Sequence, residues 1–325
     1  MLLILCLSAR LSAQEVVRLP AVEPLSPSPP GQLVSHPNSS SDILQSPGDI
    51  ALSSSTTTAI PSDVRNGVFQ KVLFDATWLA AGKSDGLGIN DMELQTIFAI
   101  PCPKRESPLV ITPGFGTQYL QSPRNVDLPP RLYTGYLDLR WMSQVTPTVG
   151  LDLAITPGVY SDFEQSSDKA FRLTGHAAAA WTWTDKMKVI LGAAYLDRPD
   201  CGVLPIGGVI WTPRADLKFD LVFPHPRIAR RIDGGLSTGD VTQDWVYVAG
   251  EFAGDAWAIR RSDGTDDQVV LSDYRLIVGV ERKVLGSLSA RIEAGYVFGR
   301  RIRYSSDTPE DWPPDTVLLR GGLTY

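Results

Sequence analysis

Long apolar runs are missing from the 325-residue chain: no stretch of about 18 consecutive apolar residues occurs, which excludes a helical membrane protein. An excess of basic residues is missing too. The net charge of -6 leaves no surplus of Lys and Arg to neutralise phosphates, which argues against nucleic acid as a partner. A membrane-spanning β-barrel stays possible, because its apolar residues are hidden at every second position.

Aromatic residues are absent from the first 68 positions. All 8 Trp, 10 Tyr and 10 Phe lie at or after Phe69. Since aromatic side chains supply much of the buried area of a folded core, the chain divides into a head without a core and a body with one.

The head contains two segments. Residues 1–13 are apolar and end in small residues, which predicts a secretory signal peptide cleaved after Ala13; a buried helix is the alternative. Cys6 follows a leucine where a lipoprotein site needs a small residue, so lipidation is not expected. Residues 14–66 are rich in Pro and Ser and predict a disordered periplasmic linker, acting as a spacer, a tether or a recognition tail.

The body, residues 67–325, alternates between apolar and polar residues. From Phe171 to Thr184 the odd positions are apolar, Gly or aromatic, and most even positions are polar; Leu288 to Phe298 repeats the pattern. Period two is typical of strands with one apolar face. We predict an all-β fold, a transmembrane antiparallel up-and-down β-barrel of about 14 strands, with 12 possible. A soluble β-sandwich also alternates and is the alternative.

Charged residues lie in mid-strand opposite the apolar faces. A barrel lumen or the surface of a sandwich could hold them. They are Asp138, Arg140, Asp152, Arg172, Lys218, Asp220, Arg275, Glu281, Arg291 and Glu293.

The C-terminal segment favours the barrel. One face carries Val317, Leu319, Gly321, Leu323 and the terminal aromatic Tyr325, with Thr324, Gly322 and Arg320 opposite. This resembles the last strand of bacterial outer-membrane proteins. The resemblance implies that Leu319, Gly321, Leu323 and Tyr325 form the signal read by the barrel-assembly machinery. It also implies location in the outer membrane of a diderm bacterium.

Strand counting gives an even number, as a single-chain bacterial barrel requires. The predicted strands are Phe69–Trp78, Ile89–Ile100, Leu109–Tyr119, Arg131–Ser143, Val149–Tyr160, Phe171–Trp183, Lys188–Leu196, Val203–Thr212, Leu217–Phe223, Arg227–Ile232, Trp245–Arg260, Val269–Arg282, Leu288–Arg303 and Thr316–Tyr325. The short turns then share one end, which is expected to be periplasmic. Cys102 falls at this end and Cys201 at the other, so no disulfide is expected between them.

Two further segments carry a family resemblance. Phe223-Pro224-His225-Pro226-Arg227-Ile228, followed by Gly250-Glu251-Phe252-Ala253-Gly254 and Trp257, resembles a family of uncharacterised bacterial outer-membrane β-barrel proteins. The resemblance covers roughly Val68 to Tyr325. It implies a fold and a compartment, but no activity.

Arg227, Arg230 and Arg231 form a basic cluster that could meet Glu251 and Asp255 of the next strand inside the lumen. Two roles are possible for this cluster: structural ion pairs, or a charged constriction that selects solutes. The residues expected to line the lumen or its constriction are Arg227, Arg230, Arg231, Glu251, Asp255, Arg275, Arg291 and Glu293.

The sequence offers little support for an enzyme. His176 and His225 have no catalytic signature around them, and Asp263, Gly264, Asp266 and Asp267 lack the full ligand pattern of a calcium loop. We therefore expect no enzyme, no catalytic residue, no metal and no cofactor. The predicted function is a passive or weakly selective outer-membrane channel for an unknown small solute, with outer-membrane lipid and the assembly machinery as partners. The alternative is a structural, adhesive or anchoring barrel that does not transport.

Overall fold

The structure, a computed structural model, describes residues 67–82, 86–102, 107–121, 126–164, 168–232, 242–284, 287–306 and 309–325. The predicted signal peptide and linker lie outside these residues. The described part contains fourteen strands and a single 3-10 turn, η1 (Asp168–Ala170). None of the described helical segments is long and apolar enough to cross a membrane.

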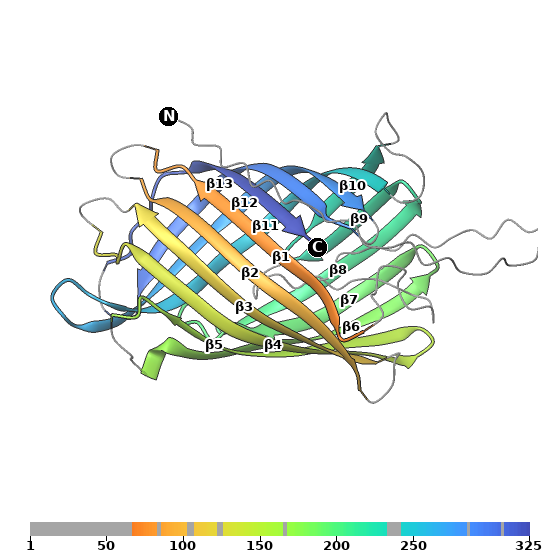
Figure 1. The fold of residues 1–325 in the computed structure, drawn as a ribbon, viewed down its shortest axis with the longest axis horizontal. Helices are drawn as coiled ribbons and strands as arrows, with labels where there is room; N and C mark the ends of the chain where they lie inside the picture. Colours follow the sequence, from red (N-terminus) through yellow and green to blue (C-terminus); the bar gives the residue numbers. More distant parts are fainter. Residues whose placement is uncertain are drawn as a thin grey trace, which may run out of the picture. The chain divides into compact units, whose positions relative to one another are not determined.

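The strands close into one antiparallel barrel in which each pairs with its neighbours in sequence and β1 pairs with β14 (Figure 1). This confirms the predicted fold class and strand number. The strands are β1 (Phe69–Leu79), β2 (Gly88–Pro101), β3 (Pro108–Gln121), β4 (Arg131–Thr146), β5 (Val149–Ser161), β6 (Phe171–Thr184), β7 (Met187–Tyr195), β8 (Val203–Arg214), β9 (Leu217–Phe223), β10 (Arg227–Ile232), β11 (Thr242–Arg260), β12 (Asp266–Val284), β13 (Ser289–Tyr304) and β14 (Thr316–Thr324).

Closure uses most of the last strand, from Leu318 to Thr324. Leu73 pairs with Thr324 and Leu79 with Leu318, and the backbone N–H groups of Val72 and Tyr325 each donate to the other residue's carbonyl at 2.9 Å. Because both edges of the sheet are paired in this way, the described strands leave no open edge at the seam.

The two ends of the barrel differ in their connections. The turn end carries the connections β2–β3, β4–β5, β6–β7, β8–β9, β10–β11 and β12–β13 together with Tyr325, and the loop end carries the others. Cys102 lies at the turn end and Cys201 at the loop end, and both are free.

The outer face of the wall is apolar and exposed, as the alternation predicts. Each strand contributes large exposed apolar or aromatic side chains at every second position, among them Phe74, Leu94, Phe115, Ile155, Phe171, Trp181, Leu191, Trp211, Leu221, Ile228, Val248, Leu276, Ile292 and Leu319. A soluble protein does not expose a continuous apolar belt of this kind. The exterior is that of a barrel surrounded by lipid.

Candidate functional site: the charged lumen

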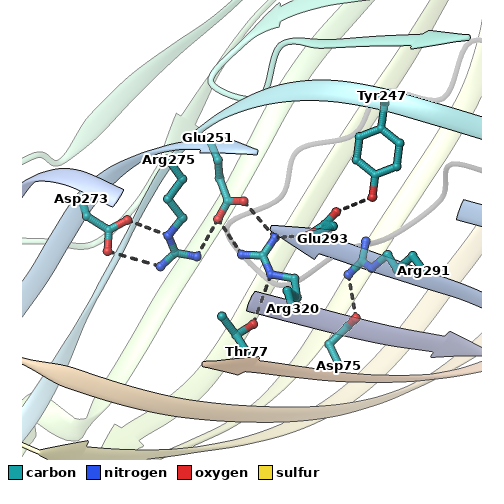
Figure 2. A network of polar contacts seen from close by, with 9 residues as sticks. All are labelled: Asp75, Thr77, Tyr247, Glu251, Asp273, Arg275, Arg291, Glu293 and Arg320. Carbon is teal, nitrogen blue, oxygen red and sulfur yellow. Dashed lines mark hydrogen bonds and ion pairs between the residues drawn. The ribbon is translucent and has the colours of Figure 1, made fainter. Parts of the chain in front are cut away.

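An ionic network lies on the inner face of β1 and β11–β14. Arg320 of β14 stands at its centre and donates to the carboxylates of Glu251, at 3.0 and 3.2 Å, and Glu293, at 3.1 Å (Figure 2). Its Nε also donates to Thr77 Oγ1 at 3.1 Å. All of these residues face inward because they occupy the strand positions between the lipid-facing ones.

Two more arginines extend the network. Arg275 donates to Asp273 at 2.6 Å and to Glu251 at 2.9 Å, and Arg291 donates to Asp75 at 2.7 Å. Glu293 also accepts the Tyr247 hydroxyl at 2.5 Å. Three arginines thus form ion pairs with four carboxylates, Asp75, Glu251, Asp273 and Glu293.

A second ionic cluster lies on β4–β6. Arg140 forms a buried two-pronged ion pair with Asp152, and His176 Nε2 lies 3.3 Å from the same carboxylate. Asp138 accepts the Thr156 hydroxyl at 2.6 Å. These mid-strand charges face the lumen, as their positions in the alternation predict.

Arg172 of β6 ties three segments together at the loop end. Its guanidinium pairs with Asp255 and donates to the Ala256 carbonyl of β11, at 2.8 Å, and to the carbonyls of Leu196 and Asp197 after β7. Only 2% of its side chain is exposed, so nearly all of its donors need protein partners.

An apolar cluster of buried side chains lies at the loop end of the barrel. We call it the loop-end cluster; its buried members are Leu79, Leu87, Ile89, Leu120, Val126, Leu132, Tyr160, Trp257, Ile259, Val269, Leu271, Val297, Ile302, Tyr304 and Leu318. β11 leans across to β5, a strand that is not its neighbour in the wall, and pairs Ala258 with Ser161. The Asp162 N–H donates to the Ala258 carbonyl at 3.2 Å, which fixes this bridge across the loop end.

The predicted lumen residues are placed unevenly. Glu251, Arg275, Arg291 and Glu293 meet in the first network. Asp255 lies apart from them with Arg172, while Arg227 donates to Glu281 at 2.8 Å and stacks on the Tyr247 ring. Glu251 contacts Arg275 and Arg320, and Asp255 contacts Arg172.

Arg230 is on the other side of the wall. Its side chain is exposed on the outer face with Ile228 and Ile232, whereas Arg231 and Ala229 are on the inner face. Successive residues of a strand point to opposite faces, so Arg230 and Arg231 cannot both face the lumen. Because Arg230 and Arg231 are adjacent in the sequence, one of them has to face outward in any strand.

Five network members were not among the predicted lumen residues: Asp75, Thr77, Tyr247, Asp273 and Arg320. Arg320 stands opposite the apolar face of the C-terminal strand, and this position was the signal that could have identified it. Within the described residues, no cluster of His, Cys, Asp or Glu has the arrangement of a metal site.

Comparisons with known proteins give weak matches to solved structures alone. No family matches the chain, and no curated protein does either. LpxR from Salmonella typhimurium is 8% identical, with a TM-score of 0.38 over 78% of this chain and 99% of that one. A bacterial polysaccharide outer-membrane secretin is 11% identical, with a TM-score of 0.38 over 81% and 98%. The toluene transporter TodX of P. putida is 9% identical, with a TM-score of 0.30 over 81% and 91%.

These similarities are too low to carry an argument about this chain. The resemblance to a family of uncharacterised barrels therefore remains an expectation. The class of protein is defined by the fold itself: a closed 14-stranded antiparallel barrel with an apolar exterior and a charged interior.

Proposed function

We propose that the chain is an outer-membrane β-barrel of a diderm bacterium that acts as a passive or weakly selective channel for small solutes. The observation that carries the proposal is the reversal of polarity across the wall, with exposed apolar side chains outside and ion-paired side chains inside. Charged groups that line a pore select solutes by charge and size. The turn end then faces the periplasm, with outer-membrane lipid around the belt and the assembly machinery as the partner for insertion.

The loop-end cluster favours a second candidate, an anchoring or adhesive barrel that does not transport. In this candidate, the apolar side chains of the cluster and the β5–β11 bridge would close the lumen at this end. A closed barrel would still hold its loops and its N-terminal segment at the membrane.

Conductance across a planar bilayer separates the two candidates. The full-length protein is inserted and single-channel steps are recorded for the wild type and for Trp257→Ala. Trp257 is buried in the loop-end cluster and donates to Thr134 Oγ1 at 3.1 Å, so its removal should widen the path. We expect small steps from the wild type and larger ones from the variant.

Trp312→Ala is the matched control, because Trp312 is exposed and lies outside the cluster. Insertion without conductance by the wild type and by both variants would contradict the channel and leave the anchoring barrel.

A further inference from the structure

Strands β11, β12 and β13 are irregular at one common level near the loop end. Gly254 on β11 has a φ of 149° and Gly299 on β13 a φ of 60°, conformations that glycine adopts far more readily than other residues. Gly254 pairs with Ser272 of β12, and the next residue, Asp273, stands opposite both Gly299 and Arg300. β13 therefore carries one extra residue here, and a bulge of this kind bends its strand.

Beyond this level, β11 and β12 lose the alternation of the wall. In the wall, every second residue faces lipid and is exposed. Four consecutive residues of β11 and three of β12 are instead all buried: Ala256, Trp257, Ala258, Ile259, Val269, Val270 and Leu271. Residues 255–272, which we call the distal hairpin, are thus covered on both faces.

The distal hairpin contacts a strand on the far side of the barrel. β5 is six positions from β11 around the wall, so in an open barrel the two strands would lie on the order of 25 Å apart. Ala258 nevertheless pairs with Ser161 of β5. The Asp162 N–H donates to the Ala258 carbonyl at 3.2 Å, and the Arg260 N–H donates to the Asp162 carboxylate at 2.8 Å.

Side chains outside β11–β13 also hold the distal hairpin. Arg172 of β6 forms an ion pair with Asp255 and donates to the Ala256 carbonyl at 2.8 Å. At the tip, Arg261 donates to Asp127 of the β3–β4 connection at 2.7 Å. Movement of the hairpin away from the opposite wall would break all of these contacts.

We propose that the distal hairpin is a lid across the loop-end mouth of the lumen, hinged at Gly254 and the β13 bulge and held shut by β5 and β6. The inference rests on the proposed channel function and adds its regulation: solutes pass while the lid is released. β11 and β12 stay paired through the whole hairpin, so the lid moves as one unit.

A reversible crosslink tests the lid in the full-length protein, with the three native cysteines changed to serine. The lid pair, Ser161→Cys with Ala258→Cys, joins the hairpin to β5, and the control pair, Ala258→Cys with Gln268→Cys, joins two strands within the hairpin. Both pairs are cross-strand partners, at a spacing that a disulfide can bridge. Oxidation should reduce single-channel openings of the lid pair about ten-fold or more, reversibly with dithiothreitol, and leave the control pair unchanged.

The hinge has its own variant. In Gly254→Ala the added Cβ would lie 2.6 Å from the Leu271 carbonyl oxygen, and the φ of 149° disfavours alanine. Strain in the closed form should make openings about five-fold more frequent. It should also speed the labelling of Ala258→Cys by a membrane-impermeant maleimide, because Ala258 is buried while the lid is shut. Gly207→Ala on β8 is the control, since an added Cβ there meets atoms at ordinary contact distances.

Gel mobility with and without boiling shows whether each variant is folded, and if Gly254→Ala does not fold, the crosslink still decides the question. Equal conductance of the lid pair in its oxidised and reduced forms would overturn the inference. So would failure of the lid pair to form a disulfide where the control pair forms one.

The result is separable from the channel test. Conductance that ignores the crosslink would refute the lid alone. Absence of conductance in every form, with labelling that Gly254→Ala still accelerates, would refute the channel alone.

Discussion

At the residue scale, the ionic network on the inner face is held together by arginines that each contact two carboxylates, Arg275 and Arg320. Arg320 bridges Glu251 and Glu293, and both of these acids have a second partner, Arg275 for Glu251 and Tyr247 for Glu293. In such a network the loss of one cation leaves buried anions without compensation, which costs more than the pair itself contributes.

Arg320→Met should therefore lower the free energy of unfolding by about 3–5 kcal/mol. Urea titration followed by the difference in gel mobility between folded and unfolded forms would measure it. Arg230→Met is the control, since Arg230 is exposed on the outer face and should change stability by about 0.5 kcal/mol or less. Adding Glu251→Gln and Glu293→Gln to Arg320→Met should recover part of the loss; no recovery would show that the network is not the cause.

A loop aspartate provides a pH-dependent contact. Burial acts to raise the pKa of Asp127, but hydrogen bonds from the Arg261 side chain, at 2.7 Å, and the Ser262 N–H outweigh it, so the pKa is lowered. A depressed pKa in the folded state means that the contact stabilises the fold fully above the ordinary carboxyl pKa of about 4, and that this stabilisation is lost as the pH falls through the lowered pKa of the folded state.

Asp127→Asn should thus reduce the melting temperature at pH 7, and the difference from the wild type should be smaller near pH 3, where the carboxylate of the wild type begins to be protonated. Melting curves of both proteins at the two pH values would test this. A difference of the same size at both values would mean that the carboxylate charge plays no part.

At the element scale, the packing of β4 against β3 needs a glycine. The ring of Tyr136 on β4 lies over Gly114 of β3, where an added Cβ would come within 2.1 Å of a ring carbon. The Tyr136 hydroxyl reaches Glu93 of β2 at 2.6 Å, so this tyrosine joins three strands across the lumen face. A side chain at Gly114 would displace the ring.

Gly114→Ala should destabilise the barrel by about 1–3 kcal/mol, measured by the same urea titration. Gly116→Ala is a control on the same strand and face, because an added Cβ there meets atoms at ordinary contact distances. If the two alanine variants were equally stable, the contact between the ring and the glycine would not contribute to stability.

At the scale of the whole molecule, assembly depends on closing β1 against β14. Tyr325 stands at the seam, where its backbone exchanges two hydrogen bonds with Val72, and its side chain is exposed on the outer face. The terminal aromatic is also the residue that we expect the assembly machinery to read.

Tyr325→Asp should accordingly reduce the folded fraction recovered from outer membranes by about ten-fold, since a charge at the lipid interface opposes insertion and the proposed assembly signal is removed. Unboiled gels of membrane fractions would report it. Thr324→Ala, one residue earlier and half-buried, is the control. Normal assembly of Tyr325→Asp would contradict the assembly signal.

The sequence by itself determined the class of fold. Period-two alternation follows directly from strand geometry, so the apolar outer face, the inward charges and all fourteen strands could be located within a few residues. The even strand number and the C-terminal strand then favoured a closed barrel over a soluble sandwich.

The tertiary structure alone decided which inward charges meet. Glu251 contacts Arg320, 69 positions away in the chain, because β11 and β14 approach across the curved inner face, and alternation carries no information about that distance. The same holds for the β5–β11 bridge and for the loop-end cluster, which depend on the tilt and stagger of strands far apart in sequence. Local periodicity determines the face to which a side chain points, while closure of the barrel determines which residues it contacts on that face.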